Sequence, residues 1–234
     1  MSFTFHLTFR HSETPEARAG AADLDAIKAL IRATPGLAKA HLYTPERAHD
    51  PYLDDGPPPL LALQLYFDDL PSLEAAAART GKLQALAGGI RSLAGAQGSQ
   101  QAMVSRSFPT PDCRFQGPPG QLPCTYLVAY SGTAPDENLW IDYYISHHPA
   151  IMARFPGIRE IEVATRVDWI SFLPWPRENC LLRNKVVFDS SAALTASLNS
   201  PVRHEMRADY NNFPPFSGAN THYPMATDTL VGTR

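Results

Sequence analysis

The feature that most constrains this chain is an internal repeat, in which a second copy follows the first at a constant offset of 121 residues. The aligned segments are Phe3-Thr4-Phe5-His6-Leu7 with Cys124-Thr125-Tyr126-Leu127-Val128, Pro35-Gly36-Leu37 with Pro156-Gly157-Ile158, and Phe67-Asp68 with Phe188-Asp189. Such repetition determines the architecture before any site is considered, and an offset without gaps is not expected by chance. Two copies are too few for a solenoid, so we predict a duplicated domain.

Each copy has the size of a small domain. We place the first unit at residues 1–108 and the second at residues 122–234, because 234 residues suit two domains of this length. Residues 109–121 between them are rich in proline, which predicts a stiff linker.

Hydrophobic patterns in both copies predict the element order βαββαβ. Residues 3–9 alternate apolar and polar side chains, as in a strand with one buried face. Residues 23–33 have the spacing of an amphipathic helix that Pro35-Gly36 ends. The other expected elements of the first copy are strands at residues 37–44, 60–67 and 100–107 and a helix at residues 73–86. In the second copy we expect strands at residues 125–130, 158–167, 181–188 and 220–227, and helices at residues 136–155 and 191–198.

This order is the ferredoxin-like arrangement, in which both helices cover one face of a four-stranded antiparallel sheet. The strand residues on the opposite face remain substantially apolar, so we expect that face to be buried too. We therefore predict an α+β fold, with two tandem ferredoxin-like units whose antiparallel sheets pack face to face as an α/β barrel within one chain. A homodimer built outside this barrel stays possible.

The composition is that of a globular protein that binds neither nucleic acid nor membrane. The net charge is −3, no run of Lys and Arg occurs, and no apolar stretch approaches the length of a membrane span. The first residues lack the pattern of a secretory signal. The three cysteines lack metal-ligand spacing, which predicts reduced thiols in a cytoplasmic protein.

The two copies differ most in their first helix. The second copy carries Trp140, Tyr144 and His148 on one helical stripe, and Tyr143 and His147 on the neighbouring stripe. The first copy has only an ordinary amphipathic helix at the matching positions. Proline follows His148 directly, so we expect the helix to end or kink there and to hold both imidazoles near the break.

Two interpretations of these histidines stay open. A pocket imidazole can move a proton on a bound small molecule, because its pKa lies near neutrality. Alternatively, a histidine at a helix end only hydrogen-bonds a freed carbonyl. We expect no metal, because His147 and His148 point about 100° apart on a helix and no third ligand has a recognisable spacing.

Other candidate residues lie in loops and on the last strand. Trp169 and Trp175 occupy a bulky loop that is a candidate lid over the pocket, or packs on the barrel rim. His222 is a possible pocket residue. The polar run at residues 203–213 could supply pocket groups, but a solvated connector is the favoured interpretation. Asp189 has a counterpart at Asp68, which favours a helix N-cap.

The second copy resembles the EthD-like family of the dimeric α/β-barrel superfamily. The residues that carry this resemblance are the helix ending in His148-Pro149, Phe155-Pro156-Gly157-Ile158, Val187-Phe188-Asp189-Ser190, Ser200-Pro201 and Asp209 to Phe213, within residues 123–227. The family usually sets its proline two places after the histidine, so the resemblance leaves open whether His148 or His147 has that role. It implies a pocket between sheet and helices, in which many superfamily members use a histidine as an acid or base.

The leading hypothesis is a cofactor-independent enzyme of the lyase or isomerase kind. His148 or His147 would transfer the proton. Tyr143, Tyr144, Trp140, Trp169, Trp175 and His222 would bind an apolar, aromatic or lactone-like small-molecule substrate. The alternative is a non-catalytic ligand-binding or stress-type protein, and a purely architectural duplicate is a third possibility.

Overall fold

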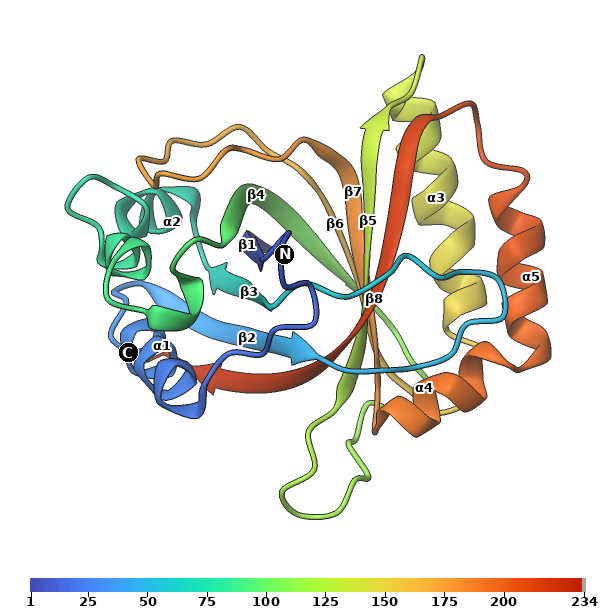
Figure 1. Ribbon diagram of the computed structural model, residues 1–234. Helices are drawn as coiled ribbons and strands as arrows, with labels where there is room; N and C mark the ends of the chain where they lie inside the picture. Colours follow the sequence, from blue (N-terminus) through green and yellow to red (C-terminus); the bar gives the residue numbers. More distant parts are fainter. Residues whose placement is uncertain (233–234) are drawn as a thin grey trace.

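The computed structural model describes residues 1–232 as a closed barrel of strands with helices packed on its outside (Figure 1). Around the barrel the strands follow the order β1-β3-β2-β8-β5-β7-β6-β4, and all neighbouring pairs are antiparallel. The predicted α+β fold with two ferredoxin-like units is confirmed. The last two residues of the predicted second unit lie outside the described residues.

Each half contributes four adjacent strands and its own covering helices. The first half consists of β1 (Ser2–Arg10), α1 (Ala21–Arg32), β2 (Leu37–Pro45), β3 (Leu61–Phe67), α2 (Leu70–Ala76), the short 3-10 helices η1 (Lys82–Ala87) and η2 (Arg91–Leu93), and β4 (Gln97–Phe108). The second half consists of β5 (Cys124–Thr133), α3 (Glu137–Met152), β6 (Ile158–Arg166), β7 (Cys180–Phe188), α4 (Ser191–Leu198), α5 (Pro201–Tyr210) and β8 (Ser217–Val231).

Two strand pairings between the halves close the barrel. β2 pairs with β8, and β4 pairs with β6. β8 is 15 residues long, so its first part pairs with β5 and its last part with β2. The duplicated chain therefore forms by itself the barrel that two separate copies would otherwise have to share.

The inside of the barrel is partly polar, which corrects in part the expectation of an apolar inner face. On β1, Phe5, Leu7 and Phe9 point outward into the core beneath the helices. The alternate residues of β1, such as His6, point inward and line a cavity. The two halves thus have separate apolar cores under their own helices, and the sheets meet through polar side chains and one small apolar cluster around Tyr43, Ala62 and Met225.

Three helical predictions are corrected by the structure. The expected helix at residues 73–86 is instead α2 followed by η1, because the chain turns sharply at Gly81, where the backbone of Ala75 and Ala76 leaves no room for a Cβ. α3 continues through Pro149 to Met152. The polar run at residues 203–213 is largely α5 and not a solvated connector.

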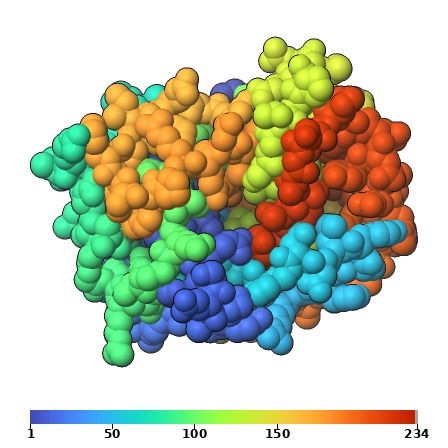
Figure 2. Space-filling model, turned by 45° about the horizontal axis from the view of Figure 1, so that its top comes forward, coloured from blue at the N-terminus to red at the C-terminus, as the bar shows by residue number. Residues whose placement is uncertain are grey.

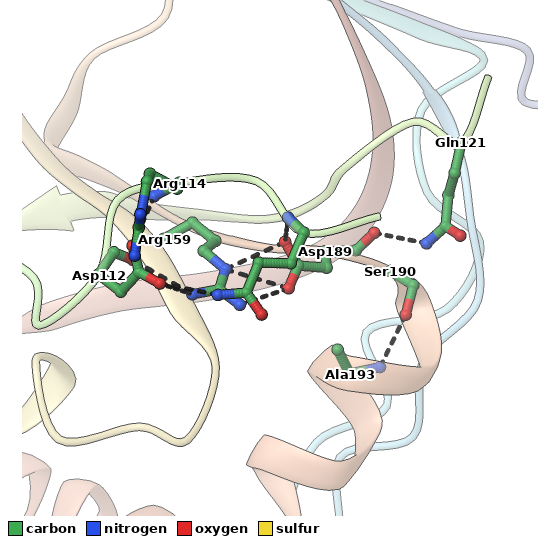
Figure 3. Close-up of polar contacts among 8 residues, drawn as sticks. Asp112, Arg114, Gln121, Arg159, Asp189, Ser190 and Ala193 are labelled. Carbon is green, nitrogen blue, oxygen red and sulfur yellow. Dashed lines mark hydrogen bonds and ion pairs between the residues drawn. The ribbon is translucent and has the colours of Figure 1, made fainter. Parts of the chain in front are cut away.

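The linker is tied to the second half by one ion-pair cluster (Figure 3). Arg159 of β6 donates from Nη2 to Asp189 Oδ2 over 2.6 Å, and its Nη1 lies 3.3 Å from Asp112 of the linker. Gln121 donates to the Asp189 carbonyl over 2.6 Å. Asp189 is therefore not the N-cap of α4, which is Ser190, whose hydroxyl accepts from the Ala193 amide over 3.0 Å.

Two loops cross reciprocally between the halves. Residues 46–60, between β2 and β3, run over the helices of the second half, and residues 167–179, between β6 and β7, run over those of the first (Figure 1). These loops correspond to each other at the repeat offset. Each half therefore extends one loop over the helices of the other half.

The remaining sequence expectations concern cysteines and membrane spans. Cys113, Cys124 and Cys180 are free cysteines; Cys113 is exposed, and the other two are buried. Within residues 1–232, no helix has both the length and the apolar character needed to cross a membrane.

Candidate functional site

Helix α3 places its aromatic stripe against the sheet of the second half. Asp136 begins the helix, because its carboxylate accepts from the Leu139 amide over 2.9 Å. Trp140, Tyr144 and His148 are all buried, and the Trp140 and Tyr144 rings stack with centroids 5.5 Å apart. The predicted stripe is confirmed, and it directs His148 into the layer between α3, α5 and the sheet.

His148 forms a buried pair with Asp209 of α5. The distance from His148 Nδ1 to Asp209 Oδ2 is 2.6 Å, and the two side chains are 6% and 9% exposed. Tyr143 donates to the other carboxylate oxygen over 3.3 Å. Because an ionised carboxylate only accepts, Nδ1 of His148 carries the proton, and Nε2 is the nitrogen with a free lone pair.

The surroundings favour neutral His148 beside ionised Asp209. Burial lowers the pKa of His148 below its usual value, although the Asp209 carboxylate opposes this effect. Burial also acts to raise the pKa of Asp209, but the hydrogen bonds from His148 and Tyr143 outweigh it and leave this pKa below its usual value. At neutral pH the pair is therefore a neutral imidazole oriented by a carboxylate, which is the arrangement of a general base.

A narrow, mainly apolar cavity of about 60 Å³ lies beside His148. It lies between the outer face of the second-half sheet and helices α3, α4 and α5. Its apolar lining comprises Tyr126, Val128, Met152, Phe155, Val186, Phe188, Leu198 and Met206. Its polar lining includes Asn184, Asn220, Arg203 and His222. The predicted candidate His222 thus lines the same cavity as His148.

Asn184 places an unused hydrogen-bond acceptor in this cavity. Its amide nitrogen donates to the Tyr144 hydroxyl over 2.5 Å, whereas its Oδ1 is buried and has no partner among the described residues. Tyr130 also lines the cavity, and burial raises the pKa of its phenol, so the hydroxyl stays protonated. The cavity therefore holds a base, an unsatisfied acceptor and a phenol in an apolar setting.

The loop at residues 46–60 of the first half covers this cavity. Asp50 is buried and accepts both from Arg203 of α5, with Nη2 to Oδ2 at 2.9 Å, and from the Tyr126 hydroxyl over 3.0 Å. Asp55 accepts from both the backbone amide and Nδ1 of His222. Leu53 is the residue of this loop that lines the cavity. Ion pairs and hydrogen bonds therefore hold this loop against the second half beside the cavity.

His147 and Tyr143 lie away from the cavity. The His147 ring is exposed and stacks on Tyr143 with centroids 4.3 Å apart, and its Nδ1 lies 2.9 Å from the Tyr143 carbonyl. His147 is therefore a histidine of the helix surface, and of the two imidazoles His148 is the one that lines the cavity.

Trp169 and Trp175 pack against the first half, so they do not cover His148 as the lid hypothesis required. Both pack against the first-half core, and Trp175 meets Phe9 edge to face at 4.8 Å. Their loop follows β6, which pairs with β4 of the first half, and Gln100 of β4 binds the loop through its side chain and backbone. Because β6 pairs with β4 of the first half, the loop that follows β6 lies over the first half and not over the helices of its own copy.

The corresponding space in the first half is filled. Ile27 occupies the position of His148 and is buried in the core, and Trp175 packs against Phe9, the counterpart of Tyr130. The two copies therefore differ at this place: the second half has a cavity beside His148, and the first half has packed apolar side chains.

Four residues around the cavity were not predicted individually from the sequence: Asp209, Arg203, Asp50 and Asp55. Asp209 and Arg203 lie in the run taken as a connector, and Asp209 also belongs to the family pattern. Asp50 and Asp55 come from the opposite copy, and no local spacing connects them to His148. Within residues 1–232, no three His, Cys, Asp or Glu side chains converge to hold a metal.

Comparison with known proteins shows the fold. No family model and no curated protein matches this sequence. The structure is similar to that of an anthrone oxidase-like protein, with 12% sequence identity, a TM-score of 0.66, and coverage of 100% of this chain and 94% of the other. It is also similar to a provisionally assigned monooxygenase from Lactobacillus acidophilus NCFM, with 10% identity, a TM-score of 0.54, and coverage of 99% and 97%.

An ethyl tert-butyl ether (EthD) family protein from Bacillus halodurans C-125 aligns with only part of this chain. It is 16% identical with a TM-score of 0.32, and it covers 42% of this chain and 96% of its own. That score is too low to establish the EthD-like family. At these identities the comparisons show a shared fold only, which is a tandem α/β barrel.

Proposed function

We propose that this protein is a cofactor-independent enzyme of the isomerase or lyase kind, which uses His148 as a general base on a small apolar substrate. The observation that carries the proposal is the buried His148–Asp209 pair, whose 2.6 Å contact leaves Nε2 free beside an apolar cavity. An imidazole whose two nitrogens both bind protein groups has no lone pair left for a substrate. Here only Nδ1 has a partner among the described residues.

The chemistry that this arrangement supports is a proton transfer. His148 Nε2 removes a proton from a carbon next to a carbonyl group, and the resulting imidazolium is stabilised by ionised Asp209. The same imidazolium then returns the proton to another carbon of the conjugated system, which completes an isomerisation without any other reactant. The protonated Tyr130 hydroxyl is the candidate donor to the carbonyl oxygen that gains negative charge.

The cavity limits the substrate to a compact, mostly apolar molecule with one or two polar atoms. Its lining is largely aliphatic and aromatic, and Asn184 Oδ1 offers an acceptor to a hydroxyl or N–H group of the substrate. Because the cavity itself holds only about 60 Å³, binding requires the cover at residues 46–60 to move. Five-membered lactones and small phenols have the required size and polarity.

The test is proton exchange on a small unsaturated lactone. α-Angelica lactone would be incubated with the protein in heavy water, and deuterium uptake and double-bond migration would be followed by NMR. We expect His148→Ala to reduce the rate by about 10²- to 10⁴-fold, which is the usual contribution of a positioned base.

His147→Ala is the matched control, because His147 is the adjacent imidazole but is exposed. We expect it to keep the wild-type rate. Equal rates in the wild type and His148→Ala would refute the assignment of the base. Lactone binding without any exchange, seen as a shift of the His148 resonance, would favour the alternative of a non-catalytic ligand-binding protein.

A further inference from the structure

The inside of the barrel contains a second and larger cavity. Its volume is about 270 Å³, and it is lined by inward-facing residues from both halves, among them His6 of β1, Gln64 of β3, Leu127 of β5 and Arg183 of β7. It lies on the opposite face of the sheet from the His148 cavity. Figure 2 shows a hollow among the loops at one end of the barrel, bordered by the segment that precedes β7 and by the first part of β8.

Small side chains keep this cavity open. Ala62, Ala129 and Ala164 all line it, and they come from β3, β5 and β6. In barrels of eight strands the interior is usually just filled by side chains, so alanine at such positions leaves room for one small ligand. Ala62 belongs to an apolar cluster that Leu127 and Tyr223 join. One wall of the cavity is therefore apolar.

The floor of the cavity is a closed network of hydrogen bonds. Tyr43 donates to Gln64 over 2.8 Å, and Gln64 donates in turn to Glu162 over 2.5 Å. Tyr66 donates to the same carboxylate over 3.0 Å, and Lys185 donates to Tyr66 over 2.8 Å. Because these groups satisfy one another, the floor has no need of a charged ligand.

The mouth of the cavity, in contrast, carries two guanidinium groups and one carboxylate partner. Arg183 pairs with Glu178 through Nη2. Arg10 has no ion pair among residues 1–232; its guanidinium lies 4.4 Å above the Tyr223 ring, and one nitrogen donates to the Pro57 carbonyl over 3.3 Å. Burial and the nearby charge of Arg10 lower the pKa of Arg183 to about 10. The two cations thus repel each other, and a bound anion would relieve that repulsion.

We propose that the barrel interior is a second ligand site, which binds a small monocarboxylic acid with an apolar body. The carboxylate would lie between Arg10 and Arg183, and the body would contact Leu127, Ala62 and Ala129. Arginine suits this role because its planar group matches a carboxylate with paired hydrogen bonds. This site is independent of His148, since the sheet separates the two cavities.

The test is calorimetric titration of the protein with benzoate, with benzamide as the neutral analogue of the same shape and with inorganic phosphate as a different anion. We expect benzoate to bind, and we expect benzamide and phosphate to bind at least tenfold more weakly. Equal affinity for benzamide would overturn the role of charge. Phosphate binding as tightly as benzoate would overturn the carboxylate assignment, and no binding of benzoate would overturn the site.

Arg10→Met is the first variant, because Arg10 has no ion pair to lose and methionine can still cover Tyr223. We expect it to weaken benzoate binding by about 10- to 100-fold, the usual contribution of a charged hydrogen-bonding group, and Arg10→Lys to recover part of the loss. Ala129→Leu fills the cavity without changing charge and should also abolish binding. His148→Ala should bind benzoate as the wild type does. Unchanged binding in both Arg10→Met and Ala129→Leu would overturn the proposal.

Discussion

His41 makes the stability of the fold dependent on pH in a way that can be calculated. It lies on β2 and is 5% exposed; its Nδ1 is 3.0 Å from the Thr229 hydroxyl, and its Nε2 has no hydrogen-bond partner within residues 1–232. Burial, followed by the charges of Lys185 and Lys39, holds its pKa far below the usual value. The native protein therefore keeps His41 neutral, whereas the unfolded chain protonates it near pH 6.5.

The sign and size of the effect follow from proton linkage. Below pH 6.5 the unfolded state binds one more proton at this residue than the folded state, so the free energy of unfolding falls as the pH falls. As long as the native pKa stays below 4, this single residue removes about 2 kcal/mol of stability between pH 8 and pH 5. This is a large share of the ~5–15 kcal/mol that stabilises a typical protein.

The assay is urea unfolding at pH 8, 7, 6 and 5, for the wild type and for His41→Gln. Other groups titrate as well, so the quantity to compare is the change in unfolding free energy between pH 8 and pH 5. We expect this change to be about 2 kcal/mol smaller in His41→Gln. The exposed His147→Gln should match the wild type. An unchanged pH dependence in His41→Gln would refute the conclusion that His41 is buried in its neutral form.

Two further predictions concern the second-half cavity and the first-half core. Asp209 raises the pKa of His148 against the effect of burial. Asp209→Asn should therefore move the His148 titration seen by NMR to lower pH, and the acid limb of any exchange activity should move with it. A move to higher pH would contradict the proposed pair. Trp175→Ala should lower the free energy of unfolding by about 2–4 kcal/mol, because it leaves a cavity against Phe9, and should leave the His148 titration unchanged. A loss below about 1 kcal/mol in urea unfolding would show that the ring only lies on the surface.

Much of the architecture could be predicted from the sequence because it depends on local periodicity and on the repeat. The constant offset between the copies and the alternation on β1 lead directly to two ferredoxin-like units. The stripe of Trp140, Tyr144 and His148 needs only the helical period, and the structure confirms that all three are buried. The asymmetry of this helix between the copies also indicated the half that holds the His148 cavity.

The expectation of an apolar barrel interior was only partly right, for a physical reason. Alternation along a strand separates two faces, but it does not say whether the second face meets water, apolar side chains or a polar network. Gln64, Tyr66 and Glu162 can be buried only because strands from opposite halves bring their polar groups within hydrogen-bond distance. Such partners are 96–98 positions apart in the chain, so no local pattern reveals them.

The sequence by itself determined the duplicated fold, the helix that carries the imidazoles and the loss of His148's counterpart in the first copy. Tertiary structure alone decided that Asp209 orients His148, that the loop at residues 46–60 covers the opposite half, and that Trp175 fills the first-half space. The physical reason is that secondary structure follows from neighbours along the chain. A site follows from side chains that barrel closure brings together from distant strands and helices.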